Sequence, residues 1–79
     1  MQNVLDENGN HIGYFNGTTV FGNNEIILYR VLDSEIYAPV VFVDLNLQRS
    51  NSALLALVGE LKGDTGLSME NEILFNLTR

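Results

Sequence analysis

The triplet Asp64-Thr65-Gly66 is the stretch of this chain that most resembles a catalytic motif. The same triplet carries the catalytic carboxylate of aspartic proteases, in which two facing carboxyl groups share one proton. Here Lys62 and Gly63 precede the triplet instead of an apolar strand. Its counterpart in a repeated segment is Thr18, which has no carboxyl group. We therefore predict a polar hairpin turn, with no catalytic role.

Oxygen-bearing side chains alternate at Asp6, Asn8 and Asn10, as ligands do in calcium-binding loops. The glycine of this stretch, Gly9, comes two positions too early for such a loop. No glutamate stands at the twelfth position to complete the ligand set. The pattern indicates a solvent-exposed hairpin turn, and we predict no metal site and no cofactor.

Nucleophilic and acid–base chemistry finds little support in the remaining residues. His11 is the only histidine, it stands beside a turn, and there is no cysteine. No serine lies in a strand–turn–helix elbow between two glycines, which is the usual setting of a nucleophilic serine; the serines are Ser34, Ser50, Ser52 and Ser68. We predict that the protein is not an enzyme and has no catalytic residues.

The charge and size of the chain indicate which classes of partner to expect. The 79 residues carry a net charge of −6 with only four basic side chains, whereas nucleic-acid binding depends on clustered lysine and arginine. A chain this short forms only a small hydrophobic core, and without cysteine no disulfide can add to the stability that this core provides. We predict a protein partner, most simply a second copy of the chain, and neither nucleic acid nor a membrane. No leader-like start follows Met1, so a complete chain is expected to be cytoplasmic; for an excised domain the localisation is unknown.

The elements that position these residues are short strands separated by glycine and asparagine turns. The segments 12–28 and 58–75 echo each other: both begin apolar-Gly-x-apolar-x-Gly, and the echo resumes one residue later at Asn24 and Asn71. Each copy predicts strand, turn, strand, turn, strand. The whole chain, 1–79, is therefore predicted to be a single β-rich domain with an internal repeat.

Two stretches depart from this pattern. Val40, Val41, Phe42 and Val43 form an apolar run after Pro39, which marks an edge or a strand start. A strand that is apolar on both faces is either enclosed by the fold or covered by a partner, so this run is the candidate subunit interface. After a polar loop at 46–52, the Ala- and Leu-rich residues near 52–57 predict at most one short helix.

Aromatic residues occur in most of the predicted strands. Tyr14 is the neighbour of Phe15, so on a strand it points to the opposite face, and we expect Tyr29 and Tyr37 to join it on one exposed surface. Tyrosine combines contact area with a polar tip, so Tyr14, Tyr29 and Tyr37 form the candidate recognition surface. Half-buried tyrosines of an ordinary core remain the alternative interpretation.

Residues 6–17, followed by Val20-Phe21 and later by 33–37, are similar to hairpins of the type D-x-x-G-x-x-I-G-x-F-x-x-G-x-I-Y. This pattern resembles the four-fold β-flower domains, which are small bacterial modules. A module similar to the PRC-barrel is the second possibility. The β-flower resemblance implies a pseudo-symmetric all-β fold without known catalytic residues, and covers about residues 4–43, with 58–75 as a further unit.

From these observations we predict an all-β, or nearly all-β, domain of short antiparallel hairpins in a barrel-like or flower-like arrangement. The expected function is a non-catalytic structural or protein-interaction module that self-associates. The alternative is a module that binds a small ligand or carbohydrate through an exposed tyrosine face.

Overall fold

The computed structural model describes residues 1–40, 43–44, 49–50 and 54–78, and these contain strands and turns but no helix. The fold is thus all-β, as the sequence predicts. The strands are β1 (Gln2–Leu5), β2 (His11–Phe15), β3 (Thr19–Gly22), β4 (Ile27–Leu32), β5 (Glu35–Val40), β6 (Val43–Asp44), β7 (Arg49–Ser50), β8 (Leu54–Lys62), β9 (Thr65–Ser68) and β10 (Ile73–Thr78).

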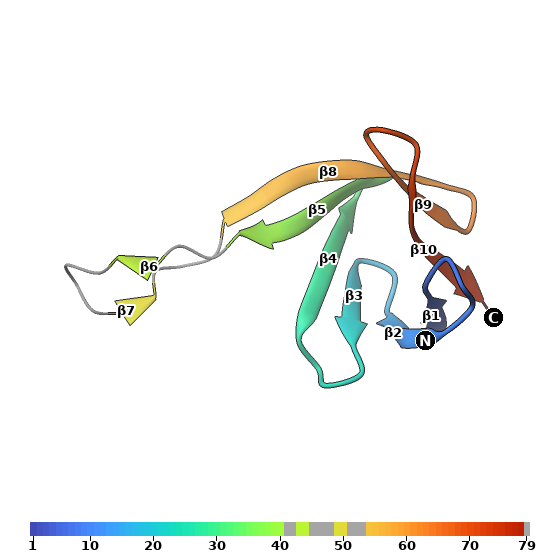
Figure 1. Cartoon of the computed structure of the whole chain (residues 1–79), viewed down its shortest axis with the longest axis horizontal. Helices are drawn as coiled ribbons and strands as arrows, with labels where there is room; N and C mark the ends of the chain where they lie inside the picture. The colour runs from blue at the N-terminus through green and yellow to red at the C-terminus, as the bar shows by residue number, and fades with distance from the viewer. Residues whose placement is uncertain (41–42, 45–48, 51–53, 79) are drawn as a thin grey trace.

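Eight of these strands close into an antiparallel barrel (Figure 1). Each of the eight pairs with the next barrel strand along the chain, β5 with β8 included, and β10 returns to pair with β1, where Val4 lies opposite Leu77. Strands β6 and β7 pair only with each other among the strands that the structure describes. Closure gives the barrel strands two neighbours each, which is how small β proteins avoid exposed sheet edges.

The barrel interior is filled by apolar side chains. Phe75, Ile36, Val4 and Val20 are completely buried, and Phe15, Val31 and Leu77 nearly so. Tyr29 packs against Phe75 with the ring centroids 5.4 Å apart. Because these side chains occupy the interior, they position the strands and leave the outer faces to make any contact with a partner.

The two echoed segments fold alike, at a constant spacing of 46 residues. Gly13 pairs with Gly22 as Gly59 pairs with Ser68. The backbone N–H of residue 23 donates to Ile12 O at 3.1 Å, and that of Met69 donates to Val58 O at the same distance. Glu25 and Asn71 occupy the same turn position, with φ values of 66° and 65°. Since this spacing stays constant, the extra residue inferred from the sequence at Asn24 and Asn71 was wrong.

The equivalence extends to the strand that precedes each segment. Val4 on β1 lies between Gly13 and Leu77, and Ile36 on β5 lies between Gly59 and Val31. Both strands have a bulge at the next residue. The barrel therefore consists of two four-stranded units, β1–β4 and β5-β8-β9-β10, related by a pseudo-two-fold arrangement.

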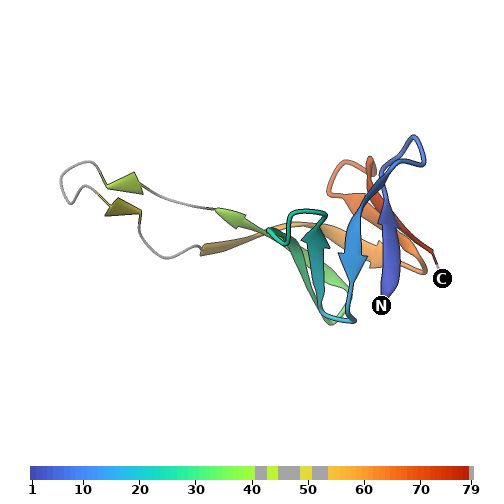
Figure 2. The same cartoon turned by 90° about the horizontal axis from the view of Figure 1, so that it is seen from below.

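The units differ at their first hairpin. In the first unit, the five residues Asp6–Asn10 connect Leu5 to His11. In the second unit, nineteen residues separate the equivalent Tyr37 from Leu57. Strands β5 and β8 use this length to continue past the barrel as a two-stranded ribbon, and β6 and β7 lie beyond its end (Figures 1 and 2).

The sequence allowed at most one short helix near 52–57, and residues 54–57 form no helix but belong to β8. Their pairing with residues 37–40 of β5 favours the strand over the helix propensity of alanine and leucine. Residues 52 and 53 lie outside the described part. The polar loop expected at 46–52 contains β7, in which Arg49 pairs with Asp44 of β6.

Candidate functional site

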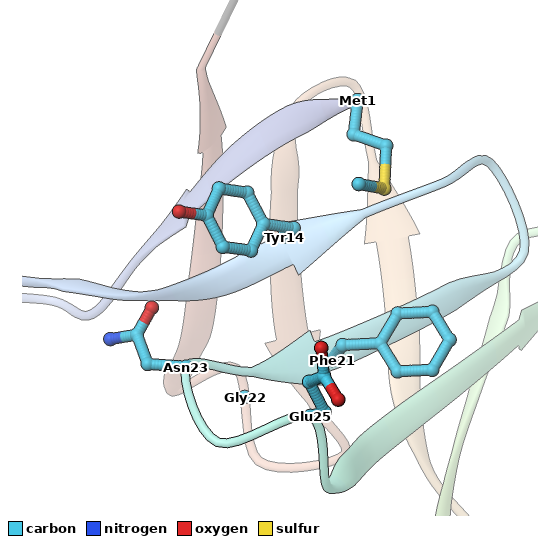
Figure 3. Close-up of a pocket in the computed structure, with 6 residues that line it drawn as sticks. All are labelled: Met1, Tyr14, Phe21, Gly22, Asn23 and Glu25. Carbon is cyan, nitrogen blue, oxygen red and sulfur yellow. The ribbon is translucent and has the colours of Figure 1, made fainter.

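An open hollow lies on the outer face of the first unit, with a volume of about 480 Å³ (Figure 3). Tyr14 and Phe21, cross-strand partners on β2 and β3, supply two aromatic rings to it. The remaining lining residues are Met1, Gly22, Asn23 and Glu25. An apolar hollow with an amide and a carboxylate at its rim can hold a small apolar group that carries a polar substituent.

Local hydrogen bonds fix one wall of this hollow. Asn23 donates from its backbone N–H to Ile12 O and from its side-chain Nδ2 to His11 O, both at 3.1 Å. His11 packs edge-on against Tyr14, with their ring centroids 4.9 Å apart. The turn after β3 and the start of β2 are thereby held together, which orients the Tyr14 ring.

The three tyrosines of the candidate recognition surface do not share one face. Tyr14 is 41% exposed on the outer face. Tyr29 lies opposite Val20 and packs on the core, where burial raises its pKa above the ordinary 10.0. Tyr37 is half-buried and pairs with Arg30 on one side and Leu57 on the other. Only Tyr14 contributes to the hollow.

A second surface is formed by the ribbon of β5 and β8. Pro39 lies opposite Leu55, and Tyr37 lies opposite Leu57. Side chains two residues apart on a strand share a face, so these four line the same side. Leu55 is 45% exposed and Leu57 is 41% exposed. The ribbon therefore presents an uncharged, largely apolar face to solvent.

The candidate interface Val40–Val43 lies next to this ribbon. Val40 pairs with Leu54 at the end of β5, and Val43 pairs with Ser50 between β6 and β7. Val41 and Phe42 lie outside the described residues. The role of this run as a subunit interface stays a prediction.

The chemically suggestive residues occur in turns or, like His11 at the start of β2, beside one. Asp6 Oδ1 accepts hydrogen bonds from the backbone N–H groups of Asn8 and Asn10, both at 2.9 Å. These bonds, led by the one from Asn10, hold the pKa of the Asp6 carboxyl below 3.8. Asp64 is exposed in the β8–β9 turn, and its backbone oxygen accepts from Leu77 N–H at 2.7 Å. His11 Nε2 lies 3.2 Å from Asn3 Oδ1 on the surface.

The sequence interpretation did not single out Leu55 and Leu57. It allowed a short helix near 52–57, so the alternation of these two residues along a strand was not considered. A usable signal was present, because no charged residue occurs between Ser50 and Val58. Sheet edges are commonly protected by charged residues or proline, so a run with neither indicates an unprotected edge.

The described residues contain no apolar helix of the length needed to cross a membrane. The resemblance to β-flower or PRC-barrel domains stays a prediction. Comparison with protein-family models, curated proteins and solved structures finds no match to this chain.

Proposed function

We propose that the protein is a non-catalytic interaction module that self-associates through its outer surface. The observation that carries this proposal is the ribbon of β5 and β8, on which Leu55 and Leu57 remain 45% and 41% exposed. Exposing a large aliphatic side chain instead of burying it forgoes roughly 1.5–3 kcal/mol. Contact with a partner would bury this surface.

The filled interior of the barrel supports binding at the outer surface and not inside the barrel. Phe75, Ile36, Val4 and Val20 are completely buried in the interior. A ligand inside the barrel would have to displace these side chains, whereas a partner on the outer face displaces only water. The proposal therefore places the function on the surface and assigns the interior to stability.

The test is the molar mass of the purified chain over a concentration series, measured by sedimentation equilibrium. The proposal expects the mass to rise with concentration towards that of a dimer. Because a small interface gives weak association, the series extends to the order of 1 mM, where a dimerisation free energy of about 4 kcal/mol is still detected. A constant mass equal to that of the monomer, 8.8 kDa, across the series would contradict self-association.

The hollow at Tyr14 favours a second candidate function, the binding of a small ligand or carbohydrate. An aromatic ring with a polar tip suits the apolar face and hydroxyls of a sugar ring. The test is an NMR titration with a panel of monosaccharides and disaccharides. Shifts confined to residues around the hollow in the wild type, lost in Tyr14→Ala and retained in Glu60→Ala at the equivalent position of the second unit, would support it. Absence of shifts across the panel would count against carbohydrate binding.

A further inference from the structure

We propose that two copies of the chain pair edge to edge through β8, in an antiparallel arrangement whose two-fold axis passes Ala56. This inference rests on the proposed self-association and names the strand, the register and the partner. It begins from the ribbon, where residues 38–40 of β5 and 54–57 of β8 pair with each other and, among the described residues, with no further strand. The ribbon therefore has two edges.

Pro39 makes the two edges unequal. Proline has no N–H to offer an added strand, and natural sheets use it to protect their edges. The β5 edge carries this protection. The β8 edge consists of Leu54, Leu55, Ala56 and Leu57, with neither proline nor charge. A further strand would thus add to β8 and not to β5.

Pro39 also determines which groups face the open edge. Since it has no N–H, its pair with Leu55 belongs to the non-hydrogen-bonded kind of the antiparallel ladder. The backbone N–H and C=O of Leu55 then point away from β5. The register continues unbroken through Ala38–Ala56 to Tyr37–Leu57, so the same groups of Leu57 also point to the open side.

The length of the open edge fixes the register. Val58 O already accepts the N–H of Met69 at 3.1 Å, and β9 pairs with β8 from Gly59 onward. Among the described residues, an added strand can therefore use only Leu55 and Leu57. Antiparallel pairing of two copies places Leu55 of one copy opposite Leu57 of the other, and each such pair exchanges N–H···O bonds. Ala56 then faces Ala56 across the axis, where its small side chain permits close approach.

Charge favours a second copy as the occupant. The chain has a net charge of −6, so two copies repel over most of their surfaces. Residues 45–59 contain no acidic residue, which makes this the stretch where two copies meet with least repulsion. The sequence Leu55-Ala56-Leu57 reads the same in both directions, so the two-fold axis places leucine opposite leucine and alanine opposite alanine. Because Pro39 blocks the opposite edge, addition stops at a dimer and does not continue into a filament.

A single cysteine tests the register directly, because the chain contains none. In a non-hydrogen-bonded antiparallel pair the Cα atoms lie about 4.5 Å apart, within the span that a disulfide bridges. We expect Ala56→Cys to form a covalent dimer under mild oxidation at a protein concentration where the wild type is partly dimeric. The control is Asn10→Cys, the equivalent position of the first unit, which is exposed in a hairpin turn. Equal cross-linking of the two variants would overturn the register.

Leu55→Pro tests the backbone contact without cysteine. The Leu55 N–H makes no bond within the ribbon, so proline removes only the donor used between copies. We expect the dimer dissociation constant to rise at least about tenfold, since both symmetry-related bonds are lost, while Leu55→Thr, which keeps the N–H, weakens it less. Circular dichroism checks that both variants fold.

The outcomes separate this inference from the proposed function. A wild-type mass that rises with concentration, with no cross-linking preference and no effect of Leu55→Pro, overturns the β8 dimer and leaves self-association standing. A wild type that stays monomeric throughout overturns both.

Discussion

Phe75 lies so close to Gly66 on the neighbouring strand that a β-carbon on Gly66 would come within 2.7 Å of two atoms of the Phe75 ring. In the first unit the same cross-strand pair is Val20 and Tyr29. The missing side chain at Gly66 lets Phe75 become completely buried, whereas Tyr29 stays partly exposed. The two units thus fill the shared interior differently: one uses a glycine beside a large ring, and the other a valine beside a partly exposed tyrosine.

Gly66→Ala is expected to destabilise the barrel by about 1–3 kcal/mol, because the new methyl group overpacks the core against Phe75. Urea denaturation measures this as a lower midpoint at an unchanged slope. In the double variant Gly66→Ala/Phe75→Leu, the smaller leucine leaves room for the new methyl group. The loss of unfolding free energy should therefore be less than the sum of the losses in the two single variants. Strict additivity of the two changes would contradict a direct clash.

Gly13 and Gly59 are equivalent positions at which a β-carbon would collide with a backbone carbonyl, that of Phe21 and of Leu67 respectively. A backbone oxygen within a sheet cannot move aside as a side chain can. Gly13→Ala and Gly59→Ala should each cost about 3 kcal/mol or more, beyond ordinary overpacking. Thermal denaturation measures both. Similar losses at the two sites are expected from the shared geometry, and a neutral result at either would contradict the close approach.

The Asp6 turn gives a pH dependence to stability. The hydrogen bonds from Asn10 and Asn8 hold the folded pKa of Asp6 below 3.8. A depressed carboxyl pKa contributes stability that is present above the unfolded pKa and is lost as pH falls through the folded pKa. Asp6→Asn keeps an acceptor oxygen for the turn but has no charge to titrate. The melting temperature of this variant should therefore fall less than that of the wild type below about pH 4, and parallel curves would contradict the prediction.

Tyr29 gives the opposite dependence at high pH. Burial raises its pKa above 10.0 because the tyrosinate is poorly solvated against the core. A raised pKa contributes stability that is present below the unfolded pKa and is lost as pH rises through the folded pKa. The wild type should lose stability above about pH 10 more steeply than Tyr29→Phe, which has no group to ionise. A titration of tyrosinate absorbance should show the Tyr29 step above 10.0 and its absence in the variant.

Turn chemistry made most of the strands predictable from the sequence. The glycine-containing turns at Asp6–Asn10 and near Gly17 and Gly63 have the left-handed glycines that such turns need. The correspondence between the two segments was visible in their Gly13 and Gly59 positions. These are local signals, and local structure follows them directly.

The ribbon was not predicted, because its conformation depends on pairing between distant residues, and the lack of charge between Ser50 and Val58 was its signal in the sequence. Ala56 and Leu57 have high helix propensity, yet Ala38 and Tyr37 pair with them as a strand. The placement of Tyr29 has a related cause. Tyr29 lies opposite Val20 on the neighbouring strand and packs against the core, which follows from the pairing of β3 with β4.

The equivalence of the two units predicts that the ribbon is dispensable for the barrel. Replacing residues 38–56 by the five residues Asp6-Glu7-Asn8-Gly9-Asn10 would connect Tyr37 to Leu57 as the first unit connects Leu5 to His11. The pairing of Ile36 with Gly59 and Val31, and the buried core, involve none of the replaced residues. We expect a folded barrel whose NMR shifts match the wild type around Phe75.

The same chimera should be monomeric, because it has lost the open β8 edge while it keeps the outer hollow at Tyr14. Sedimentation equilibrium compares its mass with that of the wild type at equal concentration. A control chimera that replaces Asp6–Asn10 with five residues of another hairpin turn should keep both the fold and self-association. An unfolded chimera would show that the ribbon stabilises the barrel. A folded chimera that still dimerises would place the contact on the barrel itself, because the short hairpin leaves it no other surface.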